Sequence, residues 1–280
     1  MSLAWTRRAV HTAVAAALLA IGACTPEPAP HLLRVMTWNI AAGRGDLAQT
    51  AEVIRSSGAD IVALQEVDVH WSERSGFADQ AARLAAMLDM DVRFAPIYRL
   101  PGAEGSPERE FGVALLSGRP IVSFRNHEIT RLSTQADDAE PRPMPGFLDA
   151  VVQVGRVTVR VLDTHLDYRP DPQVRAQQVA DMLEILGETT RPVILLGDLN
   201  APPDAPELTP LRARLRDVWT GSGSGFTYPA DAPVRRIDYI LTSGHFAVLD
   251  VRVLDTRASD HRPVVADLIV RAEAVRAIRP

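Results

Sequence analysis

The stretch that most constrains this chain is a short apolar run that ends abruptly in polar residues. Residues 193–196 predict a strand buried on both faces, because neither face of the run carries a polar side chain. Gly197 follows, and then Asp198 and Asn200, which lie on the same face of an extended chain. Three prolines soon after prevent regular structure there. An Asp/Asn turn that only caps the next helix would have a similar sequence. Whether these residues form a functional site therefore depends on the other polar clusters in the chain.

Length and composition allow one large domain or two small ones. The chain has 280 residues, of which 46% are hydrophobic and 23% are charged. Its formal net charge is -5, and removal of a leader that contains Arg7 and Arg8 makes it more negative by two. An acidic chain with 5% aromatic residues argues mildly against sequence-independent binding to nucleic acid. A small enzyme that contacts a few phosphates stays possible.

Residues 1–24 are typical of an export signal. Two arginines precede a mostly apolar run, residues 9–23, which is too short to span a bilayer comfortably. The run ends at Cys24, the single cysteine, in a pattern that resembles a bacterial lipoprotein signal. Cleavage without lipidation is the alternative; a twin-arginine signal matches poorly. Residues 25–31 form a proline-rich tether, so we expect a catalytic domain over residues 32–272.

The rest of the chain predicts alternating strands, hairpins and helices in one domain. Predicted strands cover residues 32–39, 61–64, 91–95, 111–116, 120–129, 147–154, 157–164, 193–196, 237–241, 246–254 and 263–270. Predicted helices cover residues 46–57, 77–88, 172–186 and 207–215, with long polar loops at 99–110 and 131–146. This order fits a sandwich of sheets with helices outside.

Polar side chains recur at the ends of these predicted strands, where rigid supports can build a site. The clusters are Thr37-Trp-Asn39, Gln65-Glu66, Asp163-Thr-His165, Asp198 with Asn200, Arg236-Ile-Asp238 and Ser259-Asp-His261. Each cluster alone has an ordinary explanation as a turn, a solvated carboxylate or a core histidine, but six together are much less expected. Carboxylate and amide oxygens suit Mg²⁺ or Mn²⁺, and a histidine paired with a carboxylate makes a general base. The clusters therefore indicate metal-assisted phosphoryl chemistry.

Eight motifs, in order along the chain, carry a resemblance to a known family. They are Thr37-Trp-Asn-Ile40, Leu64-Gln-Glu66, Gly112-Val-Ala-Leu-Leu-Ser117, Thr164-His-Leu166, Gly197-Asp-Leu-Asn200, Phe226-Thr-Tyr-Pro229, Arg236-Ile-Asp-Tyr-Ile240 and Ser259-Asp-His-Arg-Pro263. The set resembles the endonuclease/exonuclease/phosphatase superfamily, which includes deoxyribonuclease I, inositol polyphosphate 5-phosphatases and neutral sphingomyelinases. The resemblance implies an α/β fold, a four-layered sandwich of two mixed β-sheets packed face to face with helices outside.

The resemblance also implies which residues hold the metal. Asn39, Glu66 and Asp260 would bind one divalent cation, Mg²⁺ or Mn²⁺, with Glu66 the most direct ligand. The cation would neutralise charge that develops on the phosphate.

Five further residues match catalytic positions of the family. His261, oriented by Asp238, would take the proton from the attacking water. Asp198 and Asn200 would position that water and the phosphate, and His165 would contact phosphate oxygens and help the leaving group. Attack would be direct and in line, with no covalent intermediate.

Two other residues are expected near the substrate. Arg142 is a candidate bidentate phosphate contact, with a surface ion pair to Glu140 or Asp138 as the alternative. Tyr228 is a candidate pocket wall, with a core position as the alternative.

These observations predict an exported, metal-dependent phosphoesterase. It would be anchored through lipidated Cys24, facing the periplasm or cell exterior, or else be secreted in soluble form. We expect a monomer with no obligate protein partner. The acidic chain and the tether favour a phospholipid or small phosphodiester substrate. A secreted nuclease is the alternative, and a non-catalytic binding module on the same fold is less expected because the polar set is complete.

Overall fold

The structure is a computed structural model that describes residues 31–44, 46–188, 190–219 and 223–271. The predicted export signal and the tether up to residue 30 lie outside these ranges. No helix within them combines the length and the apolar character that a bilayer span needs.

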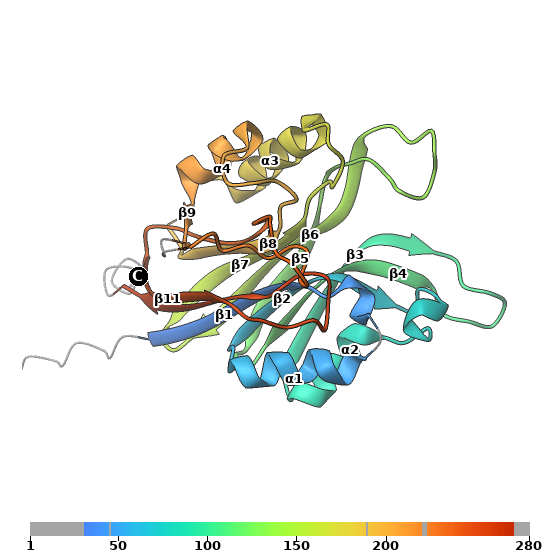
Figure 1. Ribbon diagram of the computed structural model, residues 1–280, viewed down its shortest axis with the longest axis horizontal. Coiled ribbons are helices and arrows are strands. Elements are labelled where there is room, and N and C mark those ends of the chain that lie inside the picture. The colour runs from blue at the N-terminus through green and yellow to red at the C-terminus, as the bar shows by residue number, and fades with distance from the viewer. Residues whose placement is uncertain (1–30, 45, 189, 220–222, 272–280) are drawn as a thin grey trace, which may run out of the picture.

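The described chain folds into two mixed sheets of six strands each (Figure 1). The first sheet has the order β11-β12-β1-β2-β4-β3 and the second β5-β6-β7-β8-β10-β9. The strands of the first are β1 (His31–Asn39), β2 (Ile61–Val69), β3 (Asp91–Leu100), β4 (Arg109–Ser117), β11 (Phe246–Val253) and β12 (Val264–Val270). Those of the second are β5 (Ile121–Arg131), β6 (Arg142–Val154), β7 (Val157–His165), β8 (Val193–Asp198), β9 (Arg216–Asp217) and β10 (Asp238–Thr242). The pairs β1–β2 and β7–β8 are parallel, and the other pairs are antiparallel.

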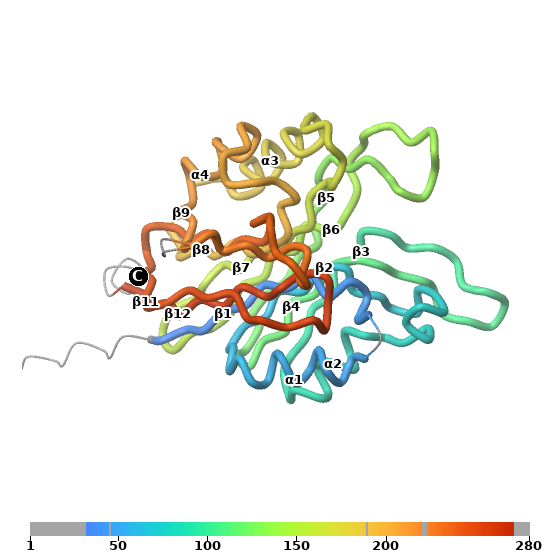
Figure 2. The backbone as a smooth tube through the Cα atoms, in the orientation of Figure 1, coloured from blue at the N-terminus to red at the C-terminus, as the bar shows by residue number. Residues whose placement is uncertain are grey.

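Helices cover the outer face of each sheet, which confirms the predicted four-layered sandwich. The helices α1 (Leu47–Ser57) and α2 (Gln80–Leu88) lie on the first sheet. The helices α3 (Gln173–Leu186) and α4 (Thr209–Arg214) lie on the second, as the tube in Figure 2 shows. Single 3₁₀ turns follow β1, precede α2 and precede α4: η1 (Ala41–Gly43), η2 (Glu73–Ser75) and η3 (Pro206–Leu208).

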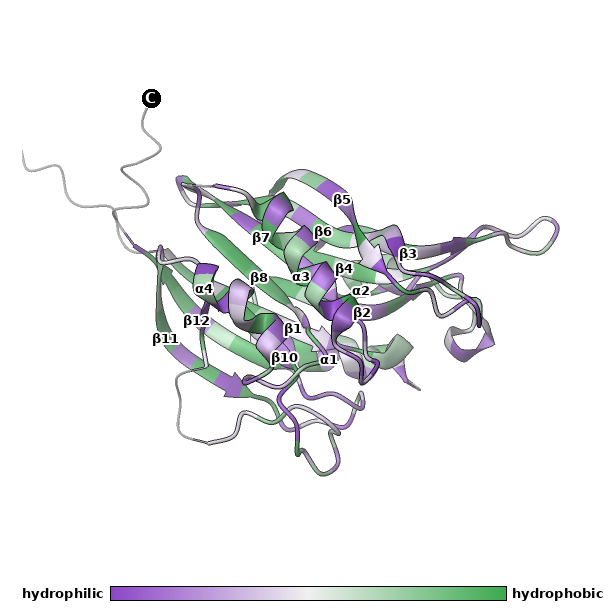
Figure 3. Ribbon diagram, turned by 90° about the horizontal axis from the view of Figure 1, so that it is seen from above, coloured by the Kyte–Doolittle hydropathy of each residue, from purple (hydrophilic) through white to green (hydrophobic). Residues whose placement is uncertain are grey.

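Three apolar clusters fill the three interfaces between the four layers. Central strands bury both faces, so alternate side chains enter different clusters: Val35 packs between the sheets, whereas Met36 and Trp38 pack toward α1 and α2. In β8, Leu196 points between the sheets and Leu195 points toward α3. The hydrophobic colour of the central strands in Figure 3 reflects this double burial, which explains the unbroken apolar runs in the sequence.

Some of the predicted elements have other bounds in the structure. The helix expected from residue 77 begins at Gln80, because Asp79 caps it by accepting a hydrogen bond from the Ala82 N–H, and Phe77 is left 51% exposed. The loop expected over residues 131–146 is shorter, because β6 already begins at Arg142. Two prolines fit in this part of β6 because β7 pairs with it only from Leu148 onward, which leaves one edge free.

Gly197 lets β7 and β8 approach closely at the point where the polar residues begin. It pairs with Thr164, and a Cβ atom at residue 197 would lie 2.2 Å from the Thr164 carbonyl oxygen. Its φ of +153° is also rarely adopted by residues with a side chain. The glycine therefore fixes how near His165 and Asp198, the next residues on each strand, come to each other.

Candidate active site

The polar clusters that the sequence predicts meet where the central strands of both sheets end. Asp198 ends β8, and its register partners are His165 on β7 and Asp238 on β10. Asn39 ends β1 in the facing sheet, and its side-chain amide reaches across to donate to Asp198 Oδ2 over 3.1 Å. One carboxylate thus links the two sheets at this edge.

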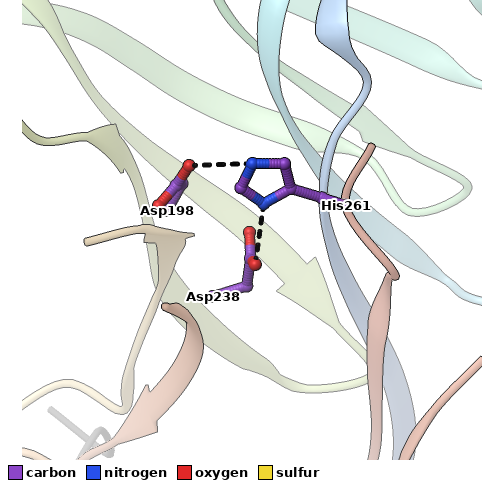
Figure 4. A group of neighbouring side chains, drawn as sticks. All are labelled: Asp198, Asp238 and His261. Atoms are coloured by element: carbon purple, nitrogen blue, oxygen red, sulfur yellow. Dashed lines mark hydrogen bonds and ion pairs between the residues drawn. The ribbon is translucent and has the colours of Figure 1, made fainter. Parts of the chain in front are cut away.

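His261 lies between two buried carboxylates (Figure 4). Its Nδ1 is 2.9 Å from Asp238 Oδ2, and its Nε2 is 3.7 Å from Asp198 Oδ2. The backbone around it is fixed by Trp38, whose indole N–H donates to the His261 carbonyl over 2.8 Å. With Asp238 as hydrogen-bond acceptor at Nδ1, the free ring nitrogen is directed to the Asp198 side.

Burial and charge shift the proton equilibria of this group. Burial alone would lower the pKa of His261, but the charge of Asp238, their hydrogen bond, and the charges of Asp198 and Asp260 together raise it to about 10. Burial, with the nearby charge of Asp238, raises the pKa of Asp198. Without a further cation, this arrangement favours the imidazolium form of His261.

His165 and Asn200 complete the surroundings of Asp198. His165 Nε2 is 3.5 Å from Asp198 Oδ2. The Asn200 N–H donates to Asp198 Oδ1 over 2.9 Å, and the Asn200 side chain donates to the Leu166 carbonyl over 3.0 Å. Asn200 has a φ of +51°, which asparagine tolerates better than most residues. All five predicted catalytic residues therefore lie together.

The three predicted metal ligands occupy different settings. The Asn39 amide donates to Glu66 Oε1 over 3.0 Å, while its own oxygen accepts from the Ala41 N–H. In this orientation Asn39 positions the Glu66 carboxylate. Asp260 lies beside them, because the neighbouring Ser259 hydroxyl donates to the Asn39 carbonyl over 2.7 Å, but its carboxylate also pairs with Arg44 at 3.3 Å.

The donor atoms at this site fit a hard divalent cation. Asp198, Asp238 and His261 each offer an atom within 4.8 Å of the others, although the sequence assigns them to catalysis. Asp238 Oδ1 is buried and has no hydrogen-bond partner among the described residues. The half-buried Glu66 carboxylate adjoins this group through Asn39. Oxygen donors in this number suit a divalent cation such as Mg²⁺ or Mn²⁺, and Glu66 is the carboxylate at the edge of the group that would face it.

The two predicted substrate contacts differ in position. The half-buried Tyr228 ring lies beside His261, with centroids 4.8 Å apart. Arg142 is exposed at the start of β6, where it pairs in register with Arg131. Within the described ranges, no ion pair joins it to Glu140 or Asp138.

The structure adds residues near the site to which sequence reasoning gave no role. Arg131 is buried, which lowers its pKa to about 10, and it donates to the carbonyls of His165, Pro145 and Gly146. The sequence gave no signal for Arg131 because it stands between a predicted strand and a polar loop. Gln65 donates to Asp163 across the sheets over 2.7 Å, and both residues stand in the polar clusters noted above.

Comparisons with known proteins indicate the family of this chain. Residues 36–261 match the model of the Endonuclease/Exonuclease/phosphatase family. A comparison with curated protein sequences gave no match. A solved endonuclease/exonuclease/phosphatase from Beutenbergia cavernae is similar, with 27% identity and a TM-score of 0.68 over 86% of this chain and 72% of that chain.

Two more distant structures share the fold. The human Nocturnin catalytic domain, solved with a bound sulfate anion, has 22% identity and a TM-score of 0.62 over 85% of this chain and 93% of that chain. A mannosyl-6-phosphatase from Bacteroides thetaiotaomicron has 18% identity and a TM-score of 0.62 over 84% of this chain and 99% of that chain. The match to the family model covers most of the sequence, and the chain therefore belongs to the Endonuclease/Exonuclease/phosphatase family.

Proposed function

We propose that this chain is a divalent-metal-dependent phosphoesterase in which water, activated by His261, attacks phosphorus in line. Members of its family are hydrolases that act on phosphate esters. The observation that carries the proposal is the buried Asp238–His261–Asp198 arrangement, with His165 on the same carboxylate. A histidine held by one carboxylate and directed toward another has the geometry of a general base.

Asp238 and Asp198 have different roles in preparing His261 to act as the base. Asp238 accepts from Nδ1–H of His261, which fixes the tautomer and leaves Nε2 as the proton acceptor. Asp198 lies 3.7 Å from that nitrogen and is placed to orient a water between them. The negative charge of these carboxylates raises the pKa of His261. A divalent cation bound nearby would offset that charge and lower the pKa again, so the neutral imidazole is favoured in the metal-loaded protein.

His165 and Asn200 would hold the phosphate. His165 and His261 both face Asp198 Oδ2, so the site holds a second imidazole beside the same carboxylate. Its N–H would donate to a phosphate oxygen and then to the leaving oxygen. Mg²⁺ or Mn²⁺ bound at Glu66, with Asn39 and Asp260 beside it, would offset the charge that builds up on the phosphate oxygens.

The first test is removal of the base. His261→Ala should lower kcat/KM for bis(p-nitrophenyl) phosphate by about 10³-fold or more, because the base and the orientation of water are lost together. Release of p-nitrophenol in Mn²⁺ buffer measures this. His70→Asn is the matched control, since the His70 ring bonds only to the Phe77 carbonyl among the described residues and asparagine tolerates its φ of +52°. A His261→Ala protein with a tenth of wild-type activity would contradict the proposed role.

The pH dependence should show the sign expected for a base. Activity should rise with pH as His261 loses its proton in the metal-loaded enzyme. Asp238→Asn removes the charge that raises this pKa, so the acidic limb should move down by about one pH unit or more while kcat falls. The measurement is kcat/KM against pH for both proteins. If kcat/KM instead falls with rising pH, and Asp238→Asn shifts the pH at which it falls, then His261 acts as a protonated donor to the phosphate.

Metal binding should be visible without turnover. Saturating Mn²⁺ should raise the melting temperature of the wild type by several degrees, because ligand binding stabilises the native state. Glu66→Gln should reduce that rise, whereas Glu73→Gln, at an exposed position on η2, should retain it. Differential scanning calorimetry with and without Mn²⁺ measures both. An equal response of the two variants would remove Glu66 from the metal site, and no response in the wild type would favour a binding module.

We also propose that the enzyme is exported and anchored by a lipid on Cys24, and that it acts on phospholipid or small phosphodiester substrates. The apolar leader, the proline-rich tether and the acidic composition support this. Supercoiled plasmid as a substrate tests the alternative: nicking that His261→Ala abolishes would make the protein a secreted nuclease.

The anchor has its own test in the full-length chain. Metabolic labelling with palmitate should mark the wild type and place it in the membrane fraction, and Cys24→Ser should lose both the label and the membrane association. Unlabelled wild-type protein in the soluble exported fraction would contradict the anchor.

A further inference from the structure

We propose that a cavity beside His165, walled by Tyr98, Phe111 and Tyr168, is the subsite for a flat, uncharged ring carried by the substrate's phosphate. We call it the aromatic cavity. The inference rests on the proposed function, because it names the group that the phosphate ester would carry into the site.

The aromatic cavity opens directly onto the catalytic residues. It has a volume of about 180 Å³, and both Glu66 and His165 contribute to its lining. Ile97 and Leu166 form apolar surface below the aromatic side chains. Sites for drug-sized ligands are about 300–1,000 Å³, so this space suits one ring rather than a long acyl chain. A group esterified to a phosphate at His165 is close enough to enter it.

Apart from Glu66 and His165, which the proposed function uses, the charged residues that line the aromatic cavity bond to other parts of the protein. Arg131 donates from each of its three nitrogens to a backbone carbonyl. Asp167 is paired with Arg169, and the Gln178 side-chain oxygen accepts from the Asp167 N–H. Because the three carbonyls hold the Arg131 guanidinium against the backbone, the surface that the cavity offers a ligand is mainly aromatic and apolar.

The aromatic side chains form a supported wall. Tyr98 and Phe111 stack with centroids 6.2 Å apart, and Trp71 packs on both, 5.7 Å from Phe111. The Tyr98 hydroxyl accepts from the Thr134 N–H and hydroxyl, which ties the opposing loop to this wall. Aromatic faces held in place in this way favour stacking of a flat ring, an interaction that needs little further ordering.

Tyr168 is placed as the outer contact of the aromatic cavity. It follows β7 three residues after His165 and is 64% exposed, which is unusual for so large a ring. Arg169 lies over the ring, with Cζ 5.3 Å from its centroid, and limits its motion. Because Tyr168 contributes little to the core, it can be removed without loss of folding.

Direct binding tests the subsite separately from catalysis. Isothermal titration calorimetry of the purified protein with Mn²⁺ would compare methyl, cyclohexyl and phenyl phosphate, which differ in the presence and flatness of a ring. Phenyl phosphate should bind about tenfold more tightly than methyl phosphate, the size of one stacking interaction. Cyclohexyl phosphate should bind clearly more weakly than phenyl phosphate. Uridine 5′-phosphate then distinguishes the two kinds of ring that the substrate could carry. If it binds more tightly than phenyl phosphate, the ring is a nucleobase; if it binds more weakly, the ring is a simple aryl group.

Variants test whether the preference for phenyl phosphate over methyl phosphate arises in the aromatic cavity. Tyr168→Ala and Phe111→Leu should each reduce the phenyl-over-methyl preference by about threefold or more, with methyl phosphate affinity unchanged. Phe77→Ala is the control, because Phe77 is also an exposed aromatic residue, at 51%, and lies outside the aromatic cavity. Equal binding of phenyl and methyl phosphate, equal binding of cyclohexyl and phenyl phosphate, or a preference that survives Tyr168→Ala would each overturn the proposal. Ring-dependent binding without any hydrolysis would leave the subsite standing and refute the proposed function instead.

Discussion

The site depends on one buried carboxylate that both sheets help to hold. Asp198 is 1% exposed, a position where an ionised group is costly unless it is paired and hydrogen-bonded. Asn39 donates to it from the first sheet, and His165 and His261 lie within 3.5 and 3.7 Å. These partners come from strand ends that are far apart in the sequence. Closing the sandwich therefore also assembles the catalytic group, so that stability and chemistry depend on the same contacts.

A second buried carboxyl shows how hydrogen-bond and charge partners oppose the effect of burial on a pKa. Asp163 is fully buried near the same edge, and burial raises its pKa well above the usual range although a hydrogen bond from Gln65 opposes this. It has no imidazole beside it, and its Oδ2 has no partner among the described residues. Burial thus favours the neutral form of Asp163, which bridges the sheets through Gln65. Burial also raises the pKa of Asp198, but the charges of His261 and His165 and the hydrogen bond from Asn39 oppose that shift.

The strands and the edge where the polar residues meet were predictable from local patterns, whereas the four-layered fold and the proposed residue roles came from the family resemblance of eight motifs. Unbroken apolar runs marked strands buried on both faces, and polar residues at their ends marked the edge where the site forms. The setting of Asp260 was not predictable, because its ion pair with Arg44 joins segments distant in sequence. Neither was the aromatic cavity, because Phe111 and Tyr98 meet through a register shift between β3 and β4, where a bulge follows Pro96. A bulge leaves no periodic signal in the sequence.

His165 connects the two halves of the proposed site. Its ring faces Asp198, while its backbone carbonyl accepts from Arg131, whose other donors hold the backbone around Gly146. Gly146 has no room for a Cβ atom, which would lie 2.2 Å from Ile97 on the cavity's apolar surface. The position of the imidazole and the shape of the aromatic cavity are thus set by one buried guanidinium. The same guanidinium therefore supports the backbone of the proposed phosphate contact and the backbone beside the proposed ring subsite.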